Sequence, residues 1–162
     1  QALEEAGVPF DPDLTAEGEV DEAGGACAMG RLLPQVERGM TAVYAINDTM
    51  ALGALRRLRE AGLRVPEDLS LAACDDIPVA AQIQPALTTV WQPKGELGQM
   101  AARMLLQQIE ARSERGESWK EKYPFKSISC HPHLVVREST RRKAESCAAP
   151  AEGETSPECE ST

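Results

Sequence analysis

Polar residues directly follow four of the apolar segments of this 162-residue sequence. In chain order they are found in Val20-Asp21, Asn47-Asp48, Asp75-Asp76 and Gln92. In an open parallel sheet the carboxyl ends of the strands meet at one edge, and ligands bind in the crevice beyond that edge. Carboxylates and amides together can hydrogen-bond a polyhydroxylated or heterocyclic small molecule. The pattern therefore predicts a binding site for a small polar ligand.

Some of these residues also have an ordinary structural explanation. Asp48 is a natural N-cap for the helix expected after it. Asp75-Asp76 can form a turn in which each carboxylate bonds nearby backbone. Asn47 and Gln92 are less easily explained by local structure, so these two residues are stronger support for a ligand site.

Signals for catalysis or for a bound metal are weak. His131 and His133 flank Pro132, but no third metal ligand and no nucleophile lies near them in the sequence. Phosphate-binding, dinucleotide-binding and hydrolase motifs are absent from the sequence. The five cysteines are odd in number and lack CxxC spacing, which favours reduced thiols over a zinc site or a disulfide framework. The sequence predicts no enzyme activity and no cofactor.

Apolar runs alternate with segments of helical period along the chain. Strands are expected at residues 14–19, 41–46, 69–73 and 87–91, with a last β-rich run at 125–136. Helices are expected at 21–36, from Asp48 or Thr49 to a C-terminal cap at Gly62, and at 96–109. This alternation is typical of βαβ units and predicts an α/β fold with a doubly wound, largely parallel sheet. The strand at 41–46 should be buried on both faces.

The helix expected at 96–109 carries a continuous apolar stripe that needs a partner surface. The stripe consists of Leu97, Met100, Ala101, Met104, Leu105 and Ile109. From Ser139 onward the composition changes to Ser, Thr, Glu, Pro and Ala, which cannot bury enough surface to fold. The chain is therefore expected to form one domain over residues 1–138 and a disordered tail over 139–162.

Charge and hydropathy exclude several other classes. The formal net charge is −9, whereas a domain that binds nucleic acid by itself usually has a basic face. No apolar run approaches the roughly 18 residues of a membrane helix, and the first 30 residues lack a signal sequence, which favours a cytoplasmic protein. A helical pattern begins at Gln1 with nothing ahead of it, which suggests a fragment.

Several spaced motifs resemble the effector domains of LacI-family transcriptional repressors, in the same order. They are Asn47 to Ala54, Gly62 to Ser70, Asp75 to Pro78, Pro85 to Val90, Gln92-Pro93, Leu97-Gly98 and Leu134 to Ser139. The resemblance implies a periplasmic-binding-protein-like domain of two lobes, with a DNA-binding helix-turn-helix head ahead of it. It also implies a homodimer formed through the effector domain.

The resemblance assigns roles to individual residues. Asn47 and Asp75 match positions that contact the effector in the family, and Gln92 matches a further such position. Val20 stands where the family often has an aromatic side chain, which argues against a sugar stacked on a ring. Independently of these matched positions, Leu52 and Ile83 lie on apolar surfaces that could form the dimer contact.

The resemblance also implies that most of the first lobe lies outside this chain. The helix at 96–109 would pack in that lobe, so its apolar stripe would have no partner here. The isolated chain is therefore expected to fold poorly, or to dimerise or aggregate through this stripe.

The implied function is ligand sensing. A small polar effector, such as a sugar, nucleoside or purine-like molecule, would bind between the lobes and shift the population of arrangements of two DNA-reading heads. Two other interpretations stay open: a solute-binding protein that serves a transporter, and a nonfunctional truncated remnant.

Overall fold

The computed structural model describes residues 2–115, 127 and 129–142, and its centre is a four-stranded sheet. The strands are β1 (Ala42–Tyr44), β2 (Ser70–Asp75), β3 (Thr88–Trp91) and β4 (His133–Val135). They lie in the order β1-β2-β3-β4, with β1, β2 and β3 parallel and β4 antiparallel to β3. The expected α/β fold with a mainly parallel sheet is confirmed.

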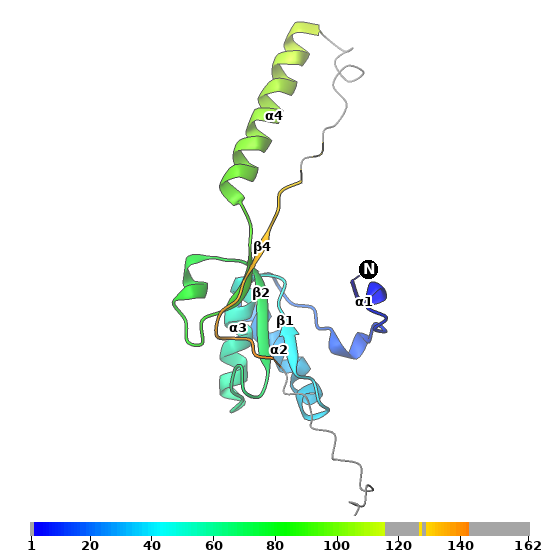
Figure 1. The fold of residues 1–162 in the computed structure, drawn as a ribbon, viewed down its shortest axis with the longest axis vertical. Helices are drawn as coiled ribbons and strands as arrows, with labels where there is room; N and C mark the ends of the chain where they lie inside the picture. The colour runs from blue at the N-terminus through cyan, green and yellow to red at the C-terminus, as the bar shows by residue number, and fades with distance from the viewer. Residues whose placement is uncertain (1, 116–126, 128, 143–162) are drawn as a thin grey trace, which may run out of the picture.

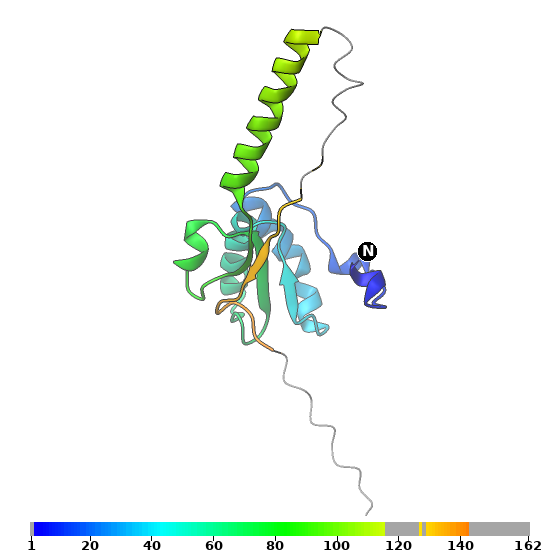
Figure 2. The ribbon, with the colours of Figure 1, turned by 45° about the horizontal axis from the view of Figure 1, so that its top comes forward.

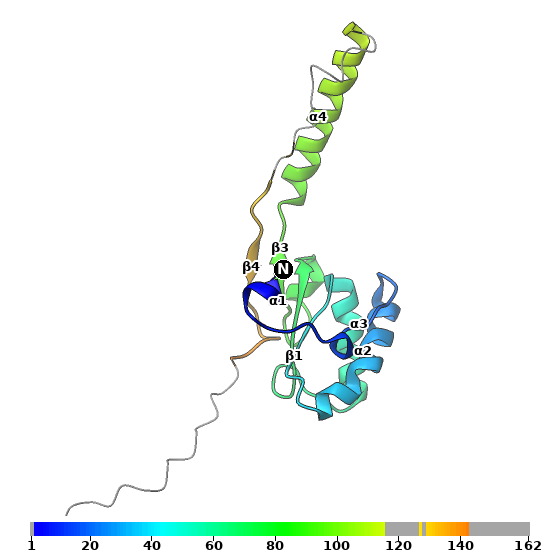
Figure 3. The same ribbon diagram turned by 90° about the vertical axis from the view of Figure 1, so that its right-hand side faces the viewer.

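Two helices cover one face of this sheet, as Figure 3 shows. They are α2 (Glu22–Glu37) and α3 (Asp48–Glu60), and both begin at side-chain caps. Asp21 accepts from the Gly24 N–H at 2.7 Å, and Asn47 accepts from the Met50 N–H at 2.8 Å. The cap of α3 is thus Asn47, and the expectation of Asp48 or Thr49 in that role was wrong.

The other helices are α1 (Ala2–Glu5), the short 3-10 turns η1 (Pro12–Leu14) and η2 (Pro78–Ala81), and α4 (Lys94–Arg115). The expected end of α3 is confirmed, since Gly62 follows its C-cap Ala61 with a φ of +75°.

Helices α2 and α3 pack at very short range over the core. A Cβ on Gly25 would lie 2.1 Å from the Met50 carbonyl oxygen, and a Cβ on Gly53 would lie 1.8 Å from that of Glu22. Only glycine permits this approach. Under the two helices lie the buried side chains of the core, which include Met29, Leu55, Leu58, Leu69, Leu71 and Leu87. This packing fixes α3, and with it the carboxyl end of β1.

Two expectations about the first half of the chain were wrong. Residues 15–19 are not a strand in the structure, although Thr15 has extended dihedral angles. The strand at 41–46 is not buried on both faces, because Tyr44 and Ile46 are 63% and 68% exposed. Residues 14–20 run alongside the free edge of β1 without pairing. Tyr44 and Ile46 are exposed because their side chains lie on the face of the sheet opposite α2 and α3, whereas Val43 and Ala45 pack against the core.

The domain also continues past the boundary expected at Ser139. This residue is 1% exposed and lies between the first residues of β2 and β3. Its hydroxyl donates to the Leu71 carbonyl at 2.6 Å and accepts from the Thr88 N–H at 2.8 Å. Composition alone missed these bonds. Arg141 also donates to the Ser70 hydroxyl and to the Glu67 carbonyl, so Ser139 to Arg141 belong with the fold. Residues 143–162 of the expected tail lie outside the described residues.

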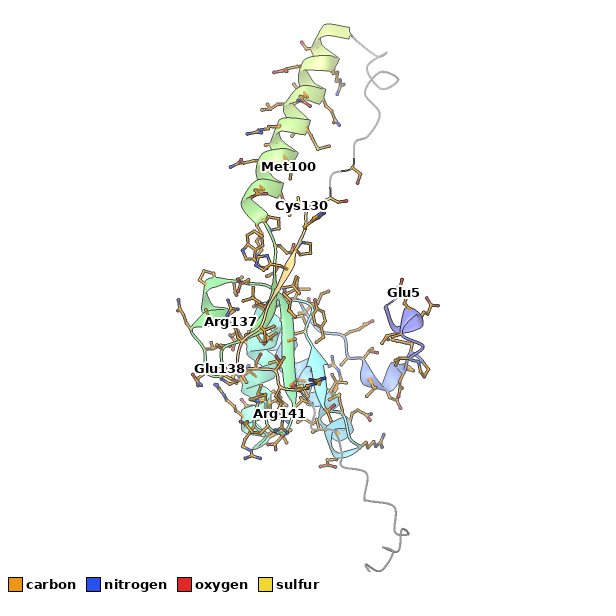
Figure 4. All side chains as sticks on the ribbon, viewed as in Figure 1. Glu5, Met100, Cys130, Arg137, Glu138 and Arg141 are labelled. Atoms are coloured by element: carbon orange, nitrogen blue, oxygen red, sulfur yellow. The ribbon has the colours of Figure 1, made fainter. Side chains whose placement is uncertain are left out.

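Helix α4 projects away from the sheet (Figures 1 and 2), and Met100 marks its first half in Figure 4. The helix runs further than the expected 96–109. Its apolar side chains are largely exposed, with Leu105, Leu106 and Ile109 at 58%, 58% and 55%. An exposed apolar surface of this kind is a site of association.

We therefore expect the isolated chain to self-associate through α4. Replacement of Leu105, Leu106 and Ile109 by Gln should lower the apparent mass in sedimentation analysis, because the surface that drives association becomes polar. Ala102→Gln, on the same helix, is the matched control and should leave the mass distribution unchanged. A wild-type chain that is monomeric and unfolds in one sharp transition would contradict this expectation.

Candidate functional site

The carboxyl ends of β2 and β3 bring Asp75 and Gln92 together. Asp75 is the last residue of β2, and Gln92 directly follows β3, its parallel neighbour. The Gln92 side-chain amide donates to Asp75 Oδ1 at 3.2 Å and to Cys74 Sγ at 3.0 Å. An amide and a carboxylate from two strands thus meet at one edge of the sheet, where sequence reasoning placed them.

Lys94, the first residue of α4, joins this pair. Its ammonium group donates to the Asp75 carbonyl and lies 3.7 Å from Asp75 Oδ1. Sequence reasoning missed Lys94, although a lysine two residues after Gln92 was a signal that could have been used. The cluster therefore combines acceptors on Asp75 with donors on Gln92 and Lys94.

These residues border a hollow of about 370 Å³ at the base of α4. Its lining consists of Asp75, Asp76, Trp91, Gln92, Pro93, Lys94, Gly95 and Glu96. The lining mixes carboxylates, an amide, an ammonium group and one indole ring. Such a surface suits a small molecule that has several hydroxyl or N–H groups.

The backbone at Asp75 and Asp76 is unusual for residues other than glycine. Their φ angles are +124° and +52°, a region that non-glycine residues seldom occupy and that is enriched at functional sites. Arg137 holds the turn, because it bonds Asp76 Oδ1 at 2.7 Å and the Leu87 carbonyl at 2.9 Å. Figure 4 shows Arg137 on the segment that follows β4, beside the sheet. The Arg137 and Asp76 side chains are only 18% and 17% exposed.

Asp48 anchors the same turn from the opposite side. It is fully buried, and its Oδ2 accepts from the Ile77 N–H at 2.8 Å while its Oδ1 accepts from the Thr89 hydroxyl at 2.5 Å. One carboxylate therefore joins the start of α3, the turn after β2 and the middle of β3. Capping was the alternative weighed for Asp48, and the structure gives it this different role.

The other two predicted site residues lie apart from the hollow. Asn47 uses its side-chain oxygen to cap α3. Val20 is 68% exposed and borders a different depression, a groove between residues 14–20 and β1. Neither of them lines the hollow beside Asp75 and Gln92.

Tyr44 contributes a neutral hydroxyl close to this edge. Partial burial raises its pKa above the ordinary value of 10.0, and Cys74, Asp75 and Asp48 raise it further. The hydroxyl would be protonated at neutral pH even at the ordinary pKa, so it is available as a hydrogen-bond donor.

One of the two histidines considered as metal ligands, His133, has a structural role. His133 stacks on Trp91, with ring centroids 4.7 Å apart and an angle of 29° between the planes. Among the residues that the structure describes, no group of three or more His, Cys, Asp or Glu side chains is placed to hold a metal ion. In the same part of the chain, no helix combines the length and the apolar character that a membrane span requires.

A parallel α/β unit with a polar hollow beyond its strand ends defines a class of small-molecule-binding domain. The chain belongs to the family of periplasmic binding protein-like domains, whose model matches residues 1–140. Its curated and structural relatives are LacI-family regulators, so the resemblance noted in the sequence is confirmed.

Three relatives illustrate the likeness. The ribose operon repressor of Haemophilus influenzae is 38% identical over 85% of this chain and 39% of its own length. The HTH-type transcriptional repressor PurR of Photorhabdus laumondii is 40% identical over 86% of this chain and 38% of its own length. The transcriptional regulator CelR, solved with cellobiose, superposes with a TM-score of 0.70 and 34% identity over 85% of this chain and 39% of its own length. The chain thus spans about two fifths of the relatives that it matches.

The buried bond between Asp48 and Thr89 gives a prediction for stability. Thr89→Val keeps the shape of the side chain but leaves a carboxylate oxygen without its donor, so unfolding in urea should become easier by about 1–3 kcal/mol. Thr15→Val removes an exposed hydroxyl that bonds the Pro12 carbonyl, and it should change stability by less than about 0.5 kcal/mol. Equal effects of the two substitutions would show that Asp48 does not depend on Thr89.

Proposed function

We propose that residues 1–162 form the effector-sensing part of a longer LacI-type repressor. The observation that carries this proposal is the cluster of Asp75, Gln92 and Lys94, which places acceptors beside donors at two neighbouring strand ends in a chain of this family. Its chemistry is that of binding rather than catalysis. DNA contact would fall to a helix-turn-helix head outside these residues, in keeping with the net charge of −9.

The effector is a small molecule rich in hydroxyl or N–H groups, that is, a sugar, nucleoside or purine-like compound. Asp75 would accept from such a group, while Gln92 and Lys94 would donate to its oxygen atoms. Asn47 follows β1, and Val20 lies across the groove from β1, so these two residues would contact only a part of the molecule that extended beyond the hollow. Val20 offers no ring for stacking, so recognition would depend on hydrogen bonds rather than on an aromatic platform.

The position of the cluster suggests how binding is transmitted. Lys94 begins α4, the helix that projects from the sheet, and Gln92 lies on the segment that leads into it. An effector that engages both residues would favour one orientation of α4 relative to the sheet. Such a shift between two arrangements would alter the spacing of two DNA-binding heads in a dimer.

A homodimer would use the surface that α3 and η2 share. Asp48 bonds Ile77 at the start of these two elements, and Arg59 donates to the Gln84 carbonyl near their ends. Leu52 on α3 and Ile83 after η2 are half-buried on this surface, so a second copy would complete their burial.

Effector binding is tested first on Asp75, in the longer regulator with ribose and cellobiose as probes. Asp75→Ala should weaken binding by roughly 10-fold to 150-fold in calorimetric titration, because a hydrogen bond to a charged group contributes about 1.5–3 kcal/mol. The thermal midpoint without sugar should stay close to that of the parent protein. Asp13→Ala, at an exposed position far from the hollow, is the matched control.

Unchanged affinity in Asp75→Ala would reject this role.

The DNA sequence directly upstream tests the class of protein. A helix-turn-helix pattern supports a repressor, a signal peptide would indicate a solute-binding protein, and an in-frame stop codon would indicate a remnant.

The dimer is tested by Leu52→Glu and Ile83→Glu in the same regulator. Each substitution places a charge in the proposed contact, which is costly to bury without a partner, so light scattering should show monomers. Thr41→Glu, at the far end of β1, should remain dimeric. Dimers in both test variants would exclude this surface.

A further inference from the structure

The Arg137 side chain reaches the turn that carries Asp75 but does not line the hollow (Figure 4). One guanidinium nitrogen donates to Asp76 Oδ1 at 2.7 Å, and another donates to the Leu87 carbonyl at 2.9 Å. Asp75 and Asp76 both border the hollow. An effect of Arg137 on a ligand in the hollow must therefore pass through this turn.

The turn depends on bonds from other elements to keep its shape. Asp75 and Asp76 have φ angles of +124° and +52°, and a residue with a side chain adopts this region only at a cost in free energy. The Asp76 N–H donates to Thr89 Oγ1 at 3.4 Å, which is long for a hydrogen bond. The short bond from Arg137 to the Asp76 carboxylate is therefore the main restraint on this residue.

The backbone of Arg137 is held independently of its side chain. Its N–H donates to Thr88 Oγ1 at 2.9 Å, and its carbonyl accepts from the same hydroxyl at 3.3 Å. The next two residues are also anchored, since Glu138 Oε2 accepts from the Ala86 N–H and Ser139 is buried between β2 and β3. A substitution at the guanidinium would therefore leave this segment in place.

The shape of the turn decides where the polar groups of Asp75 point. Its Oδ1 accepts from Gln92, and its carbonyl accepts from Lys94. The carbonyl belongs to the peptide that joins Asp75 to Asp76, and the φ of Asp75 sets the direction of its carboxylate. Relaxation of the turn would move both groups and disperse the cluster. A site that is already arranged for its ligand binds more tightly, because the ligand does not have to impose the arrangement.

We infer that Arg137 is a positioning residue for Asp75. By holding Asp76, it keeps the Asp75 carboxylate in the arrangement that binds the effector, although Arg137 lies 61 residues further along the chain than Asp76. The inference deepens the proposed function and rests on it for the role of Asp75. Asp48 holds the neighbouring Ile77, but its burial and its bond to Thr89 make it part of the core as well.

The inference is tested in the longer regulator, with ribose and cellobiose as probes in calorimetric titration well below the thermal midpoint. Lysine keeps the positive charge but lacks the planar fork that reaches two acceptors. Arg137→Lys should therefore weaken binding roughly 5-fold to 150-fold, the population change that matches the strain of one such residue. Arg64→Lys is the matched control and should keep the parent affinity. Arg64 also binds a carboxylate, Asp68 at 2.9 Å, but it lies before β2, at the end away from Asp75.

A double substitution separates positioning from a general loss of structure. In an Asp75→Ala background, Arg137→Lys should weaken binding far less than it does in the parent, because the carboxylate that it positions is gone. An equal loss in both backgrounds, or an unchanged affinity in Arg137→Lys alone, would overturn the inference. Unchanged affinity in Asp75→Ala alone would contradict the proposed function itself, so the two failures are told apart.

Hydrogen exchange tests the turn without any sugar. Arg137→Lys should speed exchange of the Asp76 and Ile77 amides at least roughly tenfold, because the turn opens more often. The Ala45 amide, which donates to the Ala72 carbonyl, is the internal control and should keep its rate. Equal rates at Asp76 and Ile77 in both proteins would show that the turn keeps its shape without Arg137, which would also overturn the inference. This measurement decides the inference if the regulator binds neither sugar.

Discussion

The buried carboxylate of Asp48 is the interaction on which the arrangement of the candidate site depends. It accepts from Ile77 and from Thr89, and so connects α3, the turn after β2 and β3. Arg137, on the segment that follows β4, holds the same turn through Asp76. With both sides fixed, Asp75 can be kept at a φ of +124°, next to Gln92. Because that backbone conformation is costly for a residue with a side chain, it persists only where surrounding bonds impose it.

Much of this architecture could be predicted from the sequence. Helical period and strong caps locate α2 and α3, and their alternation with apolar runs gives the parallel sheet. The contact between Asp75 and Gln92 follows from the rule that parallel strands end at one edge. What the sequence could not give were the bonds between distant residues. Capping propensity does not separate Asn47 from Asp48, because both residue types cap helices well and only tertiary contacts with Ile77 and Thr89 assign each to its role.

Three expectations were wrong or incomplete because each depended on contacts between parts of the chain that are distant in sequence. Residues 14–19 have the composition of a strand, but a strand requires a hydrogen-bonded neighbour, and the nearest edge lies across a groove. Tyr44 and Ile46 are exposed where burial was expected, because α2 and α3 cover only the opposite face of the sheet. Ser139 differs, because a polar composition predicted disorder while its short side chain fits between β2 and β3. Local composition indicates whether a segment can form a buried strand or helix, but not whether the chain provides the neighbouring surface that it would pack against.

The location of these exposed surfaces bears on how such a sensor would work. The groove lies at the free edge of β1. The hollow with Asp75, Gln92 and Lys94 lies at the base of α4, which projects away from the sheet. Packing of α4 would act directly on Lys94, which contacts Asp75. In the proposed sensor, α4 is therefore the element through which binding would be transmitted.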